Sequence, residues 1–239
     1  VLEGREFRRR GDEVGLAPAS YNCISEDLRG RAWVASRKGV FREEAGSFIE
    51  VRGADGRSIL NVMCMRFEQD GTVWMGTHKG GLLRLKSGSL DRIGAEHGLD
   101  ASSILGILAQ DDGTWWMSSD RGIVRTTRQA LGAVADGTLR TLGCQVLGVS
   151  DGMASIDCSG GRQPICARNG DGTLWFATQR GAAVVDPGAF RLNVLAPPVQ
   201  IEEFSFEPDS ARRRGRGEQA PSRTVLGGPF EGGLRVPAG

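Results

Sequence analysis

A tryptophan recurs along the chain inside one short sequence pattern, and this pattern restricts the possible folds more than any other feature. Each tryptophan lies three residues after a glycine, two before a small residue and three before a Ser or Thr; a second glycine follows it by six residues. The four copies centre on Trp33, Trp74, Trp116 and Trp175, spaced 41, 42 and 59 residues apart. Four copies that agree at so many positions indicate a structural repeat of about 41 residues.

The residues around each tryptophan have the pattern of antiparallel strands joined by tight turns. An Asp-Gly pair, such as that at 70–71, precedes three of the tryptophans and predicts a type I′ hairpin turn. The segment before it, such as 61–67, is apolar at nearly every residue, as in a strand covered on both faces. A third strand follows, such as 82–85, and then a more polar fourth, such as 90–93. Each copy therefore predicts a four-stranded antiparallel meander.

Such a meander has two apolar faces, so it must pack against a neighbour on each side. Four-stranded units with a period of about 40–50 residues, arranged radially, form a β-propeller. We therefore predict an all-β protein with four visible propeller blades, whose tryptophans fill the space between adjacent sheets. The long third spacing predicts an insertion of about 17 residues within 129–164, lying over the loops, and Leu2–Arg9 reads as the outer strand of an earlier blade.

All four copies resemble the two-component regulator propeller repeat. In the second copy, the matching residues are Asn61, the segment Asp-Gly-Thr-Val-Trp-Met-Gly-Thr at 70–77, and Gly-Leu at 81–82. The last copy, through 153–164, 171–178 and 184–187, is similar to the closing blade of sensors built from this repeat. Propellers of this family have seven blades, so the resemblance implies that residues 1–190 form a partial β-propeller.

The residues after the last repeat resemble a second module of the same sensors. Pro197–Glu202 looks like the entry to the Ig-like Y-Y-Y module, which links the propeller to the membrane. The tyrosine-bearing strands of that module are absent from this sequence. The resemblance therefore implies a truncated Ig-like β-sandwich at 191–239.

The resemblance also implies a function in signalling, because such repeats form extracytoplasmic sensor regions of bacterial receptors that carry a histidine kinase or a diguanylate cyclase. We therefore expect a periplasmic, non-catalytic fragment that binds a small molecule or an oligosaccharide and needs no cofactor. A homodimer is expected in the complete receptor. The Ig-like module would transmit the rearrangement inward.

The topology of a meander places the turn after its second strand on the same face as the entry to its first strand. The four turns on that face supply the candidate ligand-binding residues, which are Arg37, Lys38, His78, Lys79, Asp120, Arg121, Gln179 and Arg180. The insertion around Asp151 would join them. A ring of cations around the propeller axis would favour an anionic ligand. The alternative interpretation is that these are solvated residues of a repeated turn.

Composition excludes several other classes of function. The formal net charge of +1, from 30 basic and 29 acidic residues, argues against a nucleic-acid-binding protein. No apolar stretch approaches the ~20 residues that a membrane-spanning helix needs. The five cysteines form no CxxC pair and have no adjacent histidine, so neither a metal site nor a disulfide is expected. Cys23 and Cys64 are predicted core residues of neighbouring inner strands.

No catalytic constellation stands out. The chain has only two histidines, His78 and His97, and its candidate acid–base aspartates lie at or beside predicted turns (Asp27, Asp70, Asp111 and Asp112). The alternative to a sensor is a propeller enzyme similar to streptogramin lyase, for which His78 is the only histidine at a loop position. A quinone-cofactor dehydrogenase is a third possibility, but every repeat lacks its Ala-x-Asp element.

Overall fold

The computed structural model describes residues 2–3, 6–7, 14–16, 19–161, 163–190, 203–206 and 224–227. The chain divides into two compact units, Val1–Phe190 and Arg191–Gly239. Within the described ranges, no helix combines the length and the apolar character needed to cross a membrane.

In the second unit, strand β18 (Glu203–Phe206) pairs antiparallel with β19 (Thr224–Gly227). The rest of the predicted Ig-like module, with its predicted entry at 197–202, lies outside the described residues.

The first residues of the chain do not form the single outer strand predicted over Leu2–Arg9. Strand β1 (Leu2–Glu3) instead pairs antiparallel with β2 (Glu6–Phe7).

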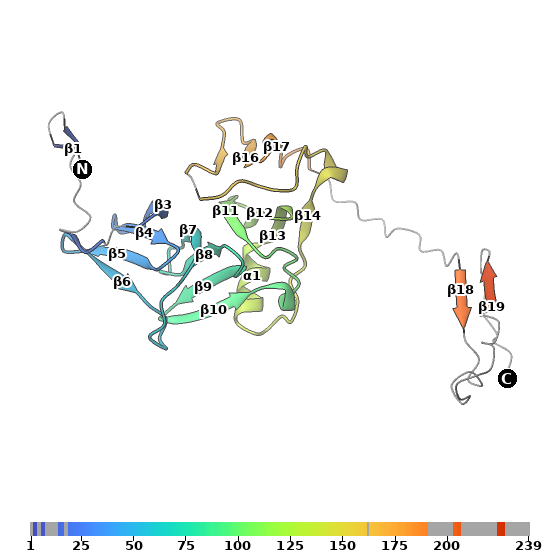
Figure 1. The fold of residues 1–239 in the computed structure, drawn as a ribbon, viewed down its shortest axis with the longest axis horizontal. Coiled ribbons are helices and arrows are strands. Elements are labelled where there is room, and N and C mark those ends of the chain that lie inside the picture. The colour runs from blue at the N-terminus through green and yellow to red at the C-terminus, as the bar shows by residue number, and fades with distance from the viewer. Residues whose placement is uncertain are drawn as a thin grey trace, which may run out of the picture. The chain divides into compact units, whose positions relative to one another are not determined.

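Four antiparallel sheets, the predicted blades, follow one another along the first unit (Figure 1). Blade 1 contains β3 (Tyr21–Glu26), β4 (Ala32–Ser36), β5 (Val40–Glu44) and β6 (Ser47–Val51). Blade 2 contains β7 (Val62–Phe67), β8 (Val73–Thr77), β9 (Leu82–Lys86) and β10 (Ser89–Ile93). Blade 3 contains β11 (Ile104–Ala109), β12 (Thr114–Ser119), β13 (Gly122–Thr127) and β14 (Gln145–Leu147), and blade 4 contains β15 (Cys166–Arg168), β16 (Leu174–Thr178) and β17 (Gly181–Val185).

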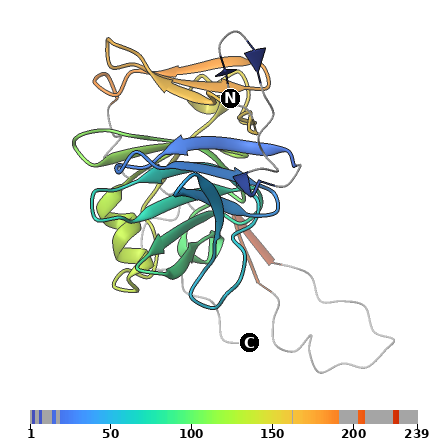
Figure 2. The same cartoon turned by 90° about the vertical axis from the view of Figure 1, so that its left-hand side faces the viewer.

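The first strand of each blade lies next to the first strand of the following blade. β3 contacts β7, β7 contacts β11, and β11 contacts β15, so these strands surround a common axis. The fourth strands β6, β10 and β14 form the outer edges of their sheets. In Figure 2, the sheet of blade 4, in orange, lies above the sheets of the other three blades. The predicted all-β propeller arrangement with four blades is confirmed, and the described residues also include one α-helix.

The repeated tryptophan packs each blade against the next. The first three repeat tryptophans are at most 3% exposed. Each clusters with the residues directly before and after the tryptophan of the following blade: Trp33 with Val73 and Met75, Trp74 with Trp115 and Met117, and Trp116 with Leu174 and Phe176. The predicted packing between adjacent sheets is confirmed for these three, whereas Trp175 in blade 4 is 44% exposed.

Gly76, two positions after Trp74, lies where blades 2 and 3 approach closely. A Cβ added at Gly76 would lie 2.6 Å from Cys64 Sγ and 2.6 Å from the Ile104 carbonyl oxygen. The Ser or Thr that follows closes the next turn, since the hydroxyl of Thr77 donates to the Gly81 carbonyl oxygen at 2.8 Å. The equivalent hydroxyls in the other blades do the same (Ser36, Ser119 and Thr178). In blade 2, the two positions thus have a packing role and a turn-closing role.

The prediction of a type I′ turn at Asp70-Gly71 is wrong. A type I′ turn needs positive φ at both central residues, and only Gly71 has one, of 84°. The Gly71 amide donates to the Glu68 carbonyl at 3.0 Å, and the Asp70 carboxylate accepts from the Thr72 amide at 3.0 Å. This is a type I turn followed by a left-handed glycine, and the aspartate side chain stabilises it.

Two type I′ turns do occur, between the third and fourth strands. Ala45 and Gly46 have φ values of 50° and 83°, and Ser87 and Gly88 have values of 50° and 85°. Each pair forms a two-residue hairpin loop, the first between β5 and β6 of blade 1 and the second between β9 and β10 of blade 2.

The insertion predicted within 129–164 lies only partly over the loops. Its first part is helix α1 (Arg128–Ala135), which contacts β10 and β13 (Figure 2). The helix buries Leu131 and Val134 against blades 2 and 3. The Thr127 hydroxyl accepts from the Ala130 amide at 3.1 Å and caps the helix. Only the segment after β14 reaches the face that carries the predicted turns.

Candidate functional site

A pocket of about 680 Å³ lies at the inner ends of the blades, and we call it the axial pocket. One predicted ligand-binding residue from each blade lines it: Arg37 from blade 1, His78 from blade 2, Asp120 from blade 3 and Gln179 from blade 4. Each of these four residues directly follows the Ser or Thr whose hydroxyl closes the turn, so that turn sets its position. The remaining lining residues are Ser20, Asn22, Met63, Ser103, Leu105, Asp157, Cys158, Gly160 and Gly161.

The second residue of each predicted pair lies away from the axial pocket. Lys79 and Arg121 line a separate hollow of about 250 Å³ together with Arg92. Asp120 borders both pockets. Lys38 and Arg180 line neither. The structure therefore brings together one half of the predicted set and separates the other half from it.

The segment 157–161 forms one wall of the axial pocket and is held by backbone hydrogen bonds. The Cys158 amide donates to the Ser119 carbonyl at 3.2 Å, and the Gln179 amide donates to the Asp157 carbonyl at 3.0 Å. Gly160 lies against Leu105 and Met63, since a Cβ added there would be 2.8 Å from the leucine side chain. This segment belongs to the predicted insertion, but Asp151 does not reach the pocket: its carboxylate accepts from the Gly148 amide at 2.9 Å.

The charges of the axial pocket are mixed, so the predicted ring of cations does not form around it. Its charged side chains in the described part of the chain are those of Arg37, Asp120 and Asp157. Burial raises the pKa of Asp120, but hydrogen bonds from the Ser102 hydroxyl and the Ser103 amide outweigh burial and lower this pKa overall. Asp120 therefore carries a negative charge near the axis at neutral pH.

His78 lies in the axial pocket without a carboxylate partner among the described residues. Its Nδ1 is 3.4 Å from the Ser103 hydroxyl. Within the described ranges, no group of three or more His, Cys, Asp or Glu side chains is placed to hold a metal ion. The pocket therefore offers hydrogen-bonding groups and isolated charges for binding.

A further pocket of about 470 Å³ lies between blades 1 and 2, on the face of the Asp-Gly turns. Its lining includes Trp33, Val73 and the carboxylate of Asp27, which binds Arg31 at 2.8 Å and the Trp33 indole Nε1 at 2.9 Å. Between blades 2 and 3, Trp115 occupies the position of Val73 and fills the equivalent space. This pocket is therefore open because the side chain of Val73 is smaller than that of Trp115 at the same position of a blade interface.

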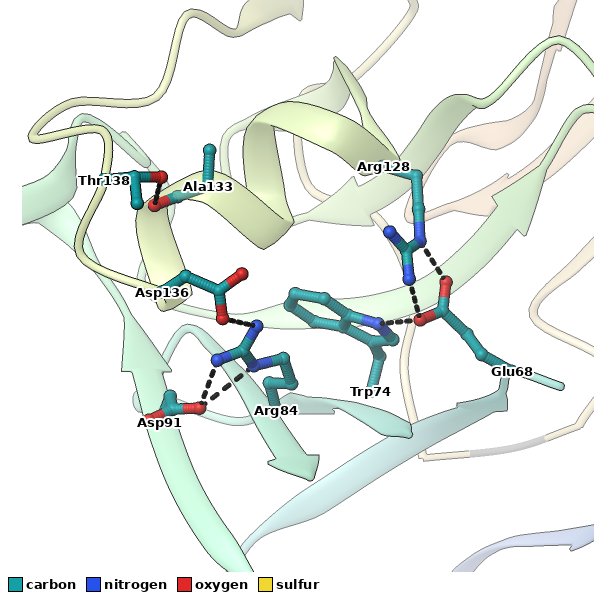
Figure 3. A network of polar contacts seen from close by, with 8 residues as sticks. All are labelled: Glu68, Trp74, Arg84, Asp91, Arg128, Ala133, Asp136 and Thr138. Carbon is teal, nitrogen blue, oxygen red and sulfur yellow. Dashed lines mark hydrogen bonds and ion pairs between the residues drawn. The ribbon is translucent and has the colours of Figure 1, made fainter. Parts of the chain in front are cut away.

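A polar network ties helix α1 to blade 2 (Figure 3). The Glu68 carboxylate accepts from the Trp74 indole at 3.1 Å and from two nitrogens of Arg128 at 2.7 and 2.9 Å. At the other end of the helix, Arg84 donates to Asp136 at 2.6 Å and also binds Asp91. All charges in the network are paired, so its role is structural.

Two features of this network recur in the first three blades and were not predicted from the sequence. An acid or amide six residues before the tryptophan accepts from its indole in the first three blades: Asp27, Glu68 and Gln110. An arginine nine or ten residues after the tryptophan lies over its ring in the same blades: Arg42, Arg84 and Arg125. The signal was present at fixed offsets but involved residue types that are common on protein surfaces.

The cysteines contribute packing. Cys23 and Cys64 are buried, which confirms them as core residues, and all five cysteines are free thiols. Burial raises the pKa of the Cys23 thiol to about 12 and that of Cys166 to about 11. Neither thiol is reactive at neutral pH, because the thiolate is the nucleophilic form.

Comparison with known proteins shows similarity in fold alone. No family model and no curated protein matches the chain. Two solved structures of the extracellular domain of BT4673 from B. thetaiotaomicron, described as a one component system and as a hybrid two component system, have TM-scores of 0.53 and 0.51 and identities of 19% and 17%. The matches cover 70% and 72% of this chain but only 23% and 25% of the solved domains. Virginiamycin B lyase from Staphylococcus aureus is less similar, with a TM-score of 0.44 and 17% identity over 74% of this chain and 57% of that one. The chain thus shares its four-blade propeller arrangement with about a quarter of the extracellular domain of BT4673.

Proposed function

We propose that this chain is an extracytoplasmic, non-catalytic ligand-sensing part of a bacterial two-component-type receptor and that the axial pocket is its ligand site. The observation that carries the proposal is the convergence of Arg37, His78, Asp120 and Gln179, one from each of four blades, on a single pocket. A ligand there would contact all four blades at once. The likeness in fold to the extracellular domain of BT4673 supports the same assignment.

Sensing requires that the ligand bind two states of the receptor with different affinities. A ligand that contacts all four blades would favour one relative arrangement of them. In this proposal, residues 191–239 belong to an Ig-like module that passes the change towards the membrane, and a homodimer carries it to a kinase or cyclase in the complete receptor. The protein is then periplasmic.

The lining of the axial pocket suits a polar ligand. Ser20, Asn22, Ser103 and Gln179 offer hydroxyl and amide groups, while Arg37 and the two aspartates add charges of both signs. A small polar molecule or an oligosaccharide fits this lining better than an apolar ligand, which would leave these groups unpaired. The pocket volume of about 680 Å³ lies within the range that ligand sites commonly have.

The second candidate function is a lyase similar to the streptogramin enzymes, and the position of His78 in the axial pocket favours it. A histidine there could act as a general base. Replacing His78 by Asn separates the two functions, because a lyase would lose turnover while a sensor would at most lose affinity. Detection of ligand cleavage that His78→Asn abolishes would establish the enzyme.

A thermal-shift screen of the chain against monosaccharides, oligosaccharides, amino acids and carboxylic acids tests the proposal. A ligand at 100 times its Kd stabilises the folded state by about 2.7 kcal/mol, which raises Tm by about 5–10 °C in a unit of this size. We expect Arg37→Ala and Gln179→Ala to reduce the shift by half or more. The matched controls Lys38→Ala and Arg180→Ala, which lie outside the pocket, should leave it unchanged. Equal losses in lining and control variants would contradict the assignment of the site.

A further inference from the structure

The hollow of about 250 Å³ beside the axial pocket gathers cationic side chains from two neighbouring blades. Lys79 comes from the turn after the second strand of blade 2, Arg121 from the equivalent turn of blade 3, and Arg92 from β10. Its volume lies below the roughly 300–1,000 Å³ of sites for drug-sized ligands. A space of this size suits a small ion or one charged group of a larger molecule. We call it the blade 2–3 hollow.

The turn that carries Lys79 is one residue longer than the equivalent turns of the other blades. The hydroxyl of Thr77 donates to the carbonyl of Gly81, four residues on, whereas the equivalent hydroxyls donate to a carbonyl three residues on. Lys79 has a φ of 61°, in the left-handed region that a residue with a side chain adopts at a cost. Its amide donates at 3.1 Å to the hydroxyl of Ser103, directly before β11. The longer turn is therefore bonded to blade 3, and Lys79 and Arg121 line one hollow.

Two of the three cations at the hollow have no ion-pair partner in the part of the chain that the structure describes. These two are Lys79 and Arg121. The third, Arg92, donates to the Glu96 carboxylate at 2.9 Å and to the Gly80 carbonyl at 3.0 Å. Its guanidinium is thus held as part of the wall, and the two unpaired cations remain for a ligand.

The lining of the hollow also contains two carboxylates, those of Asp100 and Asp120. Asp120 accepts hydrogen bonds from the Ser102 hydroxyl and the Ser103 amide, so both of its oxygens already have a donor. Three cations and two carboxylates leave the lining with one positive charge in excess. An anion in the hollow would balance this excess, and its hydrogen bonds to ammonium and guanidinium groups would be charge-assisted.

We propose that the blade 2–3 hollow binds a small oxyanion, a phosphate or carboxylate group, between Lys79 and Arg121. The planar guanidinium of Arg121 can donate to two oxygens of either group, and the ammonium of Lys79 adds a compact charge. This site differs from the ring of cations expected from the sequence, because residues of two blades line it and the axial pocket is separate. The proposal does not depend on the function of the axial pocket.

Isothermal titration calorimetry of the full chain with inorganic phosphate, with sulfate and with acetate, at constant ionic strength, measures the binding. We expect saturable binding at one site for at least one of these anions. Binding of phosphate or sulfate alone identifies a site for phosphate groups, and binding that includes acetate identifies a site that accepts carboxylates. Lys79→Met and Arg121→Met should each raise Kd by about tenfold, because each removes a hydrogen bond from a charged group. Lys79→Arg retains the charge and should stay within about threefold of the parent chain.

Lys38→Met and Arg180→Met are the matched controls, because these residues occupy the equivalent turn positions in blades 1 and 4 and line neither pocket. Both controls should bind the anion like the parent chain. All four substituted side chains are exposed, so we expect near-normal melting temperatures, which circular dichroism verifies. Absence of saturable binding for all three anions would overturn the proposal. Equal losses in the control and hollow variants would overturn it as well, because the affinity would then reflect only the overall charge of the chain.

Discussion

Trp74 and Trp175 occupy the same position of the repeat but lie in different surroundings, at 1% and 44% exposure. Replacing Trp74 by Ala leaves a cavity between blades 2 and 3, and we expect it to lower the free energy of unfolding by about 3–5 kcal/mol. Trp175→Ala should cost less than half of this. Urea denaturation at a concentration where the chain is monomeric measures both. Equal costs would show that Trp74 does not fill a blade interface.

Asp27 makes the stability of the chain depend on pH. Burial raises its pKa, but hydrogen bonds from the Trp33 indole, Arg31 and the Arg29 amide outweigh this and hold the pKa well below its usual range. The folded state thus binds a proton less readily than the unfolded state, whose aspartates have a pKa of about 3.9. The contribution is complete above that pH and is lost progressively as the pH falls further towards the folded-state pKa.

We therefore expect Asp27→Asn to lower the free energy of unfolding at pH 7 and to flatten its decrease between pH 5 and 3, about the unfolded-state pKa. Asp111→Asn serves as the control, because the Asp111 side chain is 97% exposed. Denaturant titrations at several pH values provide the comparison. A pH dependence in Asp27→Asn as steep as that of the parent chain would show that the hydrogen bonds to Asp27 do not cause it.

At the scale of residues, the sequence could predict those roles that repeat. Trp33, Trp74 and Trp116 were identified as blade-packing residues because the same residue type recurs at one offset. The exposure of Trp175 could not be read in the same way, because burial depends on a neighbouring blade and not on the residue itself. The arginines over the indole rings were missed because arginine is common on surfaces and only the cross-strand register reveals its partner.

Two glycines in different elements should respond oppositely to a methyl group. Gly76 lies in a blade contact where an added Cβ meets Cys64 Sγ and the Ile104 carbonyl, so Gly76→Ala should cost about 1–3 kcal/mol. Gly132 lies inside helix α1, where an added Cβ would lie 3.9 Å from a guanidinium nitrogen of Arg128. Gly132→Ala should therefore stabilise the protein by about 0.5–1 kcal/mol. Thermal and urea unfolding of both variants test this, and destabilisation by Gly132→Ala would argue against a helix at this place.

At the scale of elements, strands were predictable and their connections were not. The strands followed from apolar segments and glycine offsets, both of which are local. The turn at Asp70-Gly71 was predicted with the wrong geometry, because Asp-Gly favours more than one hairpin turn and loop length decides between them. Helix α1 was missed because it occurs once and buries only Leu131 and Val134, which is a weak periodic signal.

At the scale of the molecule, the order of the blades was predictable because each blade packs mainly on the next one in the chain. The topology also placed the four turns on one face, and one residue from each now lines the axial pocket. Which residue of each pair faces the axis was not predictable, since it depends on the backbone of the turn. The mixed charge of the pocket was hidden as well, because Asp157 enters from an insertion that has no counterpart in the other repeats.

Each of the first three repeat tryptophans joins its own blade to the following one, and a double-mutant cycle measures such a contact. Trp74 and Trp115 meet edge to face across blades 2 and 3, with ring centroids 5.5 Å apart. Trp74→Leu and Trp115→Leu should therefore show a coupling free energy of about 0.5–1.5 kcal/mol. Trp74 and Trp33 lie in different clusters, and their cycle should give a coupling within about 0.5 kcal/mol of zero. Absence of coupling between Trp74 and Trp115, or equal coupling in both cycles, would contradict the propeller described here.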